Sequence, residues 1–147
     1  MTKKGISAYE IGLRKLADKP HSIGDLAEKL KRKGYDQSEI ESAITQLQEE
    51  GLLDDRSYAE NYIQNLISYR TFGYFGIRNK LLLKRIDKNL ADELVQEMVT
   101  PKVEREIAQK FIEKPLNQRR SKQSLVQAMR QKGYRTDIII KTTLKLK

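Results

Sequence analysis

The chain has 147 residues, no cysteine and a single histidine, which excludes disulfides, thiolate metal sites and most histidine-based metal sites or catalytic triads. Hydrophobic residues make up 38% and charged residues 33% of the sequence, enough for one lean core in about one domain. No apolar run reaches the roughly 18 residues of a membrane span, and the first residues lack the apolar stretch of a signal peptide. We therefore expect a cytoplasmic protein that is not in a membrane.

The net charge of +9 is confined to the last third of the sequence. Residues 1–53 carry nine basic and nine acidic residues, residues 54–98 carry seven of each, and residues 99–147 carry thirteen basic and four acidic residues. Such polarity favours a polyanionic partner, either a nucleic acid or an acidic protein groove. A solvated basic face is the alternative interpretation.

Residues 1–53 predict three helices, because three side chains stand at capping-box spacing from an acidic residue. Ser7, Ser22 and Asp36 each precede a Glu or Asp by three positions, a spacing that satisfies unpaired first-turn amides. Apolar residues then recur every three or four positions and give each helix one buried stripe. Gly34 and Gly51 stand where left-handed C-terminal caps belong.

Two neighbouring carboxylates, Asp54 and Asp55, follow these helices. Consecutive helical residues point about 100° apart, so the pair cannot converge on one metal ion or one proton. Both fit the start of a helix, where a side-chain acceptor stabilises by roughly 0.5–2 kcal/mol. Ser57 has capping-box spacing from Glu60, so the N-cap stays open among Asp54, Asp55 and Ser57. Arg56 pairs with either carboxylate or contacts a partner.

The remaining elements continue the helical pattern. Apolar stripes predict three helices in residues 54–98, with a break at the sequence RTFGYFG. Thr100 and Pro101 open the next helix as N-cap and first-turn proline, and Pro115 closes it because proline lacks an amide donor. The segment 136–147 is rich in β-branched residues and by itself also fits a strand. We predict a helix there from its place in the repeat described next.

The sequence contains a weak threefold repeat. SIGDLAEKLKRKGY at residues 22–35 aligns with SKQSLVQAMRQKGY at residues 121–134, and GYFGIRNKLLLKRI at residues 73–86 supplies a middle copy. Each copy is flanked by a predicted helix on both sides, so each copy is the middle helix of a three-helix unit.

We therefore predict three helical repeats in one continuous domain, covering residues 1–53, 54–98 and 99–147. A repeat of this size cannot bury its apolar stripes alone, so neighbouring repeats should stack. The predicted fold is all-α, with three tandem three-helix repeats and nine helices. We expect an elongated, curved array of undetermined hand, which suits binding to a filament or strand.

Basic residues cluster around the middle helix of the third repeat, where first-turn amides also favour anions. Contacts of this kind are salt-dependent and blind to base sequence. A smaller basic group in the second repeat, which also includes Lys80 and Lys88, is balanced by acidic residues. The candidate partner-binding or polyanion-binding residues are Arg119, Arg120, Lys122, Arg130, Lys132, Arg135, Arg78, Lys84, Arg85 and Arg56.

Three aromatic residues, Phe72, Tyr74 and Phe75, surround two glycines between predicted helices. Exposed rings beside a basic groove can stack on bases for roughly 1–3 kcal/mol each. Such rings more often fill the core between helices, and we favour packing. Gly73 and Gly76 do not form a phosphate loop, because neither a preceding strand nor a Gly-Lys-Ser/Thr ending is present.

A helix-turn-helix DNA-binding protein or transcription regulator is the alternative function, because residues 22–44 fit that motif with a recognition helix at Asp36–Gln48. That helix has several glutamates in or beside it and no lysine or arginine, so it should repel phosphate. An enzyme is a third hypothesis, yet the sequence offers no nucleophile–base pair and no convergent acids. We therefore assign no catalytic residue, no metal ligand and no cofactor.

The stretch GLLDDRSYA at residues 51–59 resembles the central motif of the RecX family of RecA regulators. The resemblance spans nearly the whole chain and is weakest after residue 100, where only QKGY and the basic bias support it. One departure is Arg85, which stands where that family usually has Gly; a left-handed Arg costs about 1 kcal/mol more than Gly. Further matching residues are Arg70, Gly73, Ile77, Arg78, Leu81, Lys84 and Ile86, with Ser22, Asp25, Leu26, Lys29, Leu30, Lys33 and Gly34 upstream.

The resemblance implies a noncatalytic, monomeric regulator that binds the RecA recombinase or its nucleoprotein filament. It implies inhibition of RecA's ATP hydrolysis, strand exchange and coprotease activity, and thus a place in DNA repair, recombination and the SOS response. Non-specific contact with single- or double-stranded DNA is a further expectation. Five residues are expected to act as structural caps rather than to contact a partner: Asp54, Asp55, Ser22, Gly34 and Gly133.

Overall fold

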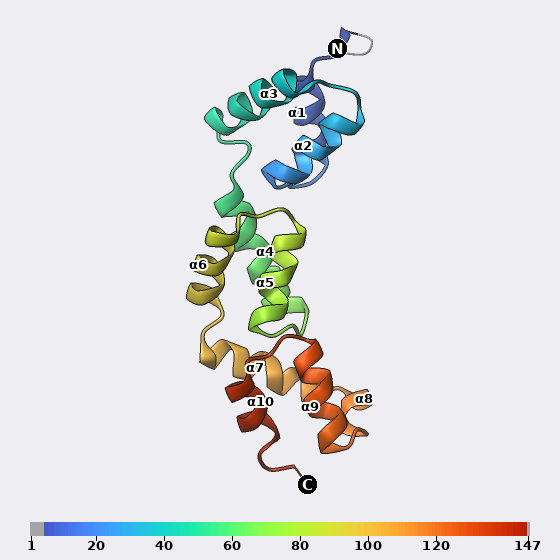
Figure 1. The fold of residues 1–147 in the computed structure, drawn as a ribbon, viewed down its shortest axis with the longest axis vertical. Coiled ribbons are helices and arrows are strands. Elements are labelled where there is room, and N and C mark those ends of the chain that lie inside the picture. The colour runs from blue at the N-terminus through green and yellow to red at the C-terminus, as the bar shows by residue number, and fades with distance from the viewer. Residues whose placement is uncertain (1–4, 147) are drawn as a thin grey trace. The chain divides into compact units, whose positions relative to one another are not determined.

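The computed structural model describes residues 5–146, which form helices joined by turns and loops, with no β-strand among them (Figure 1). This confirms the predicted all-α class. The helices are α1 (Ala8–Asp18), α2 (Ile23–Arg32), α3 (Gln37–Glu49), α4 (Asp55–Tyr69), α5 (Tyr74–Leu83), α6 (Lys88–Met98), α7 (Pro101–Ile112), α8 (Pro115–Gln118), α9 (Lys122–Gln131) and α10 (Thr136–Thr143).

The described residues form ten helices, one more than predicted, because Pro115 begins the short helix α8. Proline is tolerated at a first helical position, where its missing amide would have no intrahelical partner. Helix α7 ends at Ile112 with Glu113 as its C-cap, so Pro115 follows the end of α7 and starts α8. The β-branched segment after Arg135 is the helix α10, since Ile138 and Ile139 are buried on one side of it.

The chain divides into two compact units. Unit 1 contains the described residues up to Ala59 together with Leu83–Asp87, and unit 2 contains Glu60–Leu82 and the described residues from Lys88 onward. The repeat boundaries at residues 53 and 98 remain a prediction. Among the described residues, no helix combines the length and the apolar content needed to cross a membrane.

Unit 1 is built around the three-helix bundle of α1, α2 and α3 (Figure 1). Each helix turns one apolar stripe inward, and Leu26, Leu30 and Leu47 are completely shielded from solvent. Burial of one such side chain stabilises by roughly 1.5–3 kcal/mol. The stripes predicted from the sequence are therefore the contact surfaces of this bundle.

Side-chain caps begin the helices of this bundle. The hydroxyls of Ser7 and Ser22 accept the amide proton of the residue three positions further on, at 3.0 and 3.1 Å. Asp36 and Glu39 form a complete capping box, with the two hydrogen bonds at 2.8 and 3.0 Å. Gly34 follows α2 with a φ of 98°, a left-handed conformation that glycine adopts without steric cost.

The two carboxylates Asp54 and Asp55 cap different helices. Asp54 precedes α4, and its Oδ1 accepts the amide proton of Arg56 at 2.9 Å. Asp55 is the first residue of α4, but its Oδ1 accepts the amide proton of Ile23 at 2.7 Å, at the start of α2. Asp55 therefore stands at the start of α4, as predicted, but its carboxylate caps α2. Burial raises the pKa of the Asp55 carboxyl, against the lowering effect of the hydrogen bond from Ile23.

A second contact at the start of α2 comes from the segment Leu83–Asp87. The hydroxyl of Ser22 donates to the carbonyl of Lys84 at 2.6 Å. Ser22 is completely buried, so this hydroxyl would lose its acceptor if the segment moved away. Ser22 therefore caps α2 and also ties a distant segment to it.

Arg85 takes the left-handed conformation that the comparison with the family pattern anticipates. Its φ is 63°, the only positive value at a non-glycine position among the described residues. Gly24 makes room for it, because a Cβ at Gly24 would lie 2.6 Å from the Arg85 Cβ. The guanidinium reaches Asp25 at 3.4 Å and Glu28 at 4.0 Å. Arg85 thus packs against α2 within unit 1.

His21 is buried beside the start of α2, and it forms two polar contacts. Its Nδ1 lies 2.9 Å from the carbonyl oxygen of Lys19, and its Nε2 lies 2.6 Å from the Nζ of Lys29. An ammonium can only donate, so Nε2 accepts and Nδ1 carries the proton that is donated to Lys19. The ring is therefore neutral in this arrangement. Burial lowers the pKa of His21 below its ordinary value of 6.5, and the charge of Lys29 also lowers it.

This arrangement predicts that unit 1 loses stability as the pH falls below 6.5, the ordinary pKa of histidine. In that range the unfolded chain binds a proton that the folded chain does not, so protonation favours unfolding. Urea denaturation across this pH range should show a falling free energy of unfolding, and His21→Gln should reduce the slope. An equal slope in both proteins would show that other groups cause the pH dependence.

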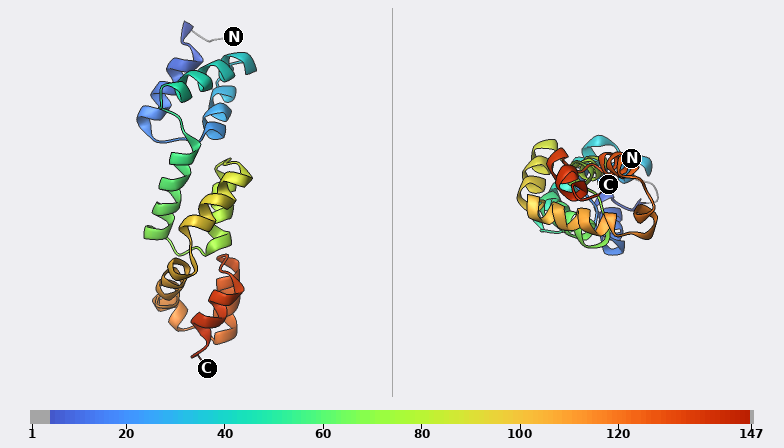
Figure 2. Two further views of the ribbon diagram at one scale, coloured as in Figure 1. Left: turned by 90° about the vertical axis from the view of Figure 1, so that its left-hand side faces the viewer. Right: turned by 90° about the horizontal axis from the view of Figure 1, so that it is seen from below.

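Unit 2 contains the rest of α4 and the helices α5 to α10. Ile63, Ile77 and Leu94 are fully buried, from α4, α5 and α6 respectively, and Ile107 and Met129 are as deeply buried on α7 and α9. Figures 1 and 2 show α7, α9 and α10 gathered together. The turn between α4 and α5 lies against the turn after α9, and this contact positions the candidate site.

Candidate polyanion-binding surface

Three glycines bring the α4–α5 turn against the turn that follows α9. The amide of Gly73 donates to the carbonyl of Lys132 at 2.9 Å, and the amide of Phe75 donates to the carbonyl of Gly133 at 2.8 Å. A Cβ added at Gly73, Gly76 or Gly133 would overlap the backbone of the opposite turn. The sequences RTFGYFG and QKGY therefore form one contact, and glycine is needed on both sides of it.

This contact places lysines and aromatic rings in an alternating row, which we call the cation ladder: Lys80, Phe72, Lys132, Phe111 and Lys114. The Nζ atoms of Lys80 and Lys132 lie 4.8 and 4.0 Å from the centre of the Phe72 ring. Those of Lys132 and Lys114 lie 5.9 and 6.0 Å from the centre of the Phe111 ring. Both rings thus interact with two cations, at distances typical of cation–π contacts.

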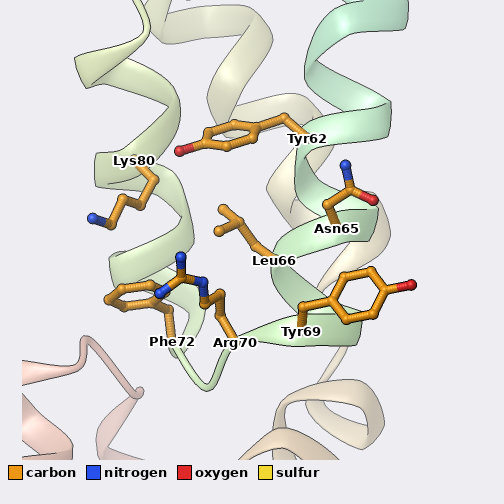
Figure 3. A pocket seen from close by; sticks show the side chains of 7 residues that line it. All are labelled: Tyr62, Asn65, Leu66, Tyr69, Arg70, Phe72 and Lys80. Atoms are coloured by element: carbon orange, nitrogen blue, oxygen red, sulfur yellow. The ribbon is translucent and has the colours of Figure 1, made fainter.

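The ladder borders a groove between α4 and α5 with a volume of about 410 Å³. Figure 3 shows Leu66 directed into its middle, with the guanidinium of Arg70 beside the Phe72 ring. The ring of Tyr69 lies at the edge and points away from Lys80. The groove is lined by Tyr62, Asn65, Leu66, Tyr69, Arg70, Phe72 and Lys80.

Positive charge accumulates at this groove without a neutralising carboxylate. Arg70, Lys80, Lys114 and Lys132 make no ion pair within the described part of the chain. Burial lowers the pKa of the Lys132 ammonium, and the charges of Lys114, Arg70 and Lys80 lower it further. The four cations therefore repel one another, and an anion bound among them would relieve that repulsion.

A buried carboxylate holds together the elements behind this surface. Glu104 on α7 is completely buried and accepts the backbone amide protons of Tyr74 at 3.0 Å and Arg135 at 2.9 Å. The Arg135 Nε donates to its other oxygen at 2.6 Å, and the guanidinium lies 4.2 Å from the centre of the Tyr74 ring. Glu104 thereby ties the starts of α5 and α10 to α7.

The remaining basic residues predicted in the third repeat lie around α8 and α9. Arg119 follows α8, Lys122 begins α9 and Arg130 is in its last turn. These three side chains make no hydrogen bond or ion pair within the described part of the chain. Arg120 instead donates to Asn117 and Ser124, each at 2.9 Å. That these residues contact a partner stays a prediction.

The basic residues predicted in the second repeat are mostly engaged within the protein. Arg78 forms an ion pair with Asp92, and Arg85 packs on α2 as described above. The backbone carbonyl of Lys84 accepts from a serine hydroxyl, and its side chain is half-buried. Arg56 is exposed at the start of α4. The structure therefore brings Lys132 alone, of the predicted residues, into the cation ladder.

Sequence reasoning did not name Arg70 or Lys114 as candidate binding residues: Arg70 entered only as a match to the family pattern. It named Lys80 only within a group balanced by acids. These residues are far apart in the sequence and follow no common periodicity. The signal that could have found them is the pairing of two glycine-containing breaks, RTFGYFG and QKGY, each beside basic residues. No group of three or more His, Cys, Asp or Glu suited to holding a metal ion occurs in residues 5–146.

Comparison with known proteins gives consistent matches. The family model "RecX, first three-helix domain" matches residues 8–47, which contain α1, α2 and most of α3. The regulatory protein RecX of Chlorobaculum tepidum is 29% identical over 140 residues, covering 95% of this chain and 88% of that protein. The regulatory protein RecX of Chlorobium phaeobacteroides is 28% identical over 90 residues, which span 61% of this chain and only 60% of that relative.

The fold has a solved counterpart. The crystal structure of RecX from Lactobacillus salivarius superposes with a TM-score of 0.85 at 25% sequence identity. The superposition covers 95% of this chain and 94% of that chain. The likeness therefore extends over all the predicted repeats and is not limited to the region of the family model.

Proposed function

We propose that this chain is a member of the RecX family, and that it binds the RecA recombinase or the RecA–DNA filament and inhibits its activities. The activities are ATP hydrolysis, strand exchange and the coprotease function. The observation that supports this most is the match along 95% of the chain to a relative named as a regulatory protein. We further propose a noncatalytic role in the cytoplasm, exerted by a monomer with three repeats at residues 1–53, 54–98 and 99–147.

The distribution of charge supports a polyanionic partner. All the net positive charge lies after residue 98, and Arg119, Lys122 and Arg130 there have no partner within the described residues. Unpaired cations of this kind strengthen binding to phosphate through counterion release. A filament of RecA on DNA presents such phosphates alongside protein surface, and we assign these three residues to that contact.

The helix-turn-helix alternative receives no support from unit 1. Helix α3 would be the recognition helix, and it is followed by Glu50 and contains Glu39, Glu41 and Glu49 but no basic residue. Glu39 is also used in the capping box that begins the helix. Carboxylates at these positions would face phosphate with the wrong charge.

We expect purified protein to lower the ATPase rate of RecA on single-stranded DNA at stoichiometric amounts. Changing Arg119, Lys122 and Arg130 to Glu should weaken this inhibition at least about tenfold, because attractive contacts become repulsive. The matched control changes Lys102, Arg105 and Lys110 on α7 to Glu; these residues are exposed and give the same change in net charge.

Two outcomes would count against these assignments. Equal weakening by both triple variants would reject the placement of the contact around α8 and α9. No association with the filament and an unchanged ATPase rate at several-fold excess would reject RecA as the partner. Circular dichroism of each variant establishes that it is folded before the comparison is made.

A further inference from the structure

From the groove between α4 and α5 and the cation ladder beside it, we propose a binding site for single-stranded nucleic acid. Phosphates would lie against Arg70, Lys80 and Lys132, and a base would stack on the exposed ring of Tyr69. The site includes Lys132 but none of Arg119, Lys122 and Arg130, the residues assigned above to the RecA filament, and it requires no RecA. It therefore goes beyond the proposed function.

The first support is the convergence of cations from separate elements. Arg70 follows α4, Lys80 lies on α5, Lys114 precedes α8 and Lys132 follows α9. Lys80 and Lys132 share the Phe72 ring, and Lys132 and Lys114 share the Phe111 ring, so these three lysines are held together by packing. A cluster without a carboxylate focuses positive potential on the groove that it borders.

The second support is the presence of an aromatic ring with no internal function. Tyr69 is 81% exposed and makes no hydrogen bond or ring contact within the described part of the chain. It is adjacent in sequence to Arg70 and borders the same groove (Figure 3). Rings beside a cationic groove are the arrangement with which proteins bind single strands.

The size and polarity of the groove agree with a nucleotide. Its volume of about 410 Å³ falls within the range of small-ligand sites. Leu66 provides an apolar floor, and the exposed amide of Asn65 can donate to and accept from a base edge. An acidic protein segment would satisfy the cations as well, but it would have no use for a ring at the rim.

The test measures the anisotropy of a fluorescein-labelled oligothymidine titrated with the full chain, in the absence of RecA. The double variant Arg70→Gln/Lys80→Gln should bind about tenfold more weakly than the wild type. Its slope of log K against log salt should fall by about 1.4, since each single-strand phosphate contact contributes about 0.7. The control Lys102→Gln/Lys110→Gln removes the same charge from α7 and should change affinity less than about twofold.

A second variant tests the ring. Tyr69→Leu keeps an apolar side chain and should weaken binding roughly tenfold without changing the salt slope, because stacking and phosphate contacts contribute separately. Equal affinities of the Arg70/Lys80 variant and its control would overturn the proposal. A second combination of results would also overturn it: Tyr69→Leu binds oligothymidine as tightly as the wild type does, and oligoglutamate of equal charge displaces the oligothymidine from this variant. The site would then suit an acidic protein.

Failure of this site and failure of RecA binding are distinguishable. If the protein binds oligothymidine but leaves RecA unaffected, the groove is supported and the proposed regulation is not. If it inhibits RecA but the groove variants bind oligothymidine like the wild type, the groove proposal fails and the proposed regulation stands.

Discussion

Replacing Glu104 by alanine is expected to lower the free energy of unfolding of unit 2 by about 3–5 kcal/mol. The carboxylate is fully buried and accepts three hydrogen bonds, from Tyr74 N–H, Arg135 N–H and the Arg135 Nε. Its removal leaves the Arg135 Nε and two backbone amides without an acceptor, while the Arg135 Nη2 still donates to the Val99 carbonyl at 3.1 Å. Each buried donor left unpaired costs about 1–3 kcal/mol.

Urea denaturation followed by circular dichroism measures this loss, and amide hydrogen exchange assigns it to unit 2. Glu106→Ala removes an exposed carboxylate from the same helix and should change stability by less than about 0.5 kcal/mol. Glu104→Gln keeps an acceptor oxygen but not the charge, so its loss of stability should lie between those of Glu104→Ala and Glu106→Ala. A loss of similar size for Glu104→Ala and Glu106→Ala would show that the buried ion pair does not hold these helices together.

The second large effect is expected for Gly76→Ala. Gly76 lies within α5, where alanine is intrinsically favoured over glycine by about 1 kcal/mol. The added Cβ would overlap the carbonyl oxygen of Lys132, which belongs to the backbone and cannot rotate away. Forcing an extra methyl group into a packed contact costs about 1–3 kcal/mol, so we expect net destabilisation.

Gly133→Ala should cost more, since it adds left-handed strain at a φ of 85° to the same overlap. Gly51→Ala separates the two effects, because Gly51 has a φ of 74° and nothing near its would-be Cβ. Its loss should be the strain of about 1 kcal/mol alone. Chemical denaturation of the three variants decides the order, and stabilisation by Gly76→Ala would show that the two turns are not in contact.

The variant Gly76→Ala also links the fold to the candidate site. The same contact of turns positions Lys132 beside the Phe72 ring. If the turns separate, the cation ladder loses its central lysine, and oligothymidine binding should weaken together with stability.

Local signals explain why the sequence was sufficient for the helices. Ser22 and Asp36 accept amide protons only three residues away, and Gly34 takes its left-handed φ at the end of α2. Such interactions depend on neighbours in the chain, so spacing reveals them. The short helix that begins at Pro115 was harder to predict, because a proline is found both after the end of a helix and at the start of one.

The tertiary structure alone decided what the charged residues do. Asp55 has the local pattern of a helix start, yet its carboxylate caps α2, because folding brings Ile23 within 2.7 Å of it. Arg135 has the composition of a partner-binding residue, yet the buried Glu104 engages it. Helix caps and apolar stripes are short-range and periodic, so the amino-acid sequence by itself determined the all-α fold. Charge partners are set by distances between residues far apart in the chain, so only the folded structure could select Arg70, Lys80, Lys114 and Lys132 as one cluster.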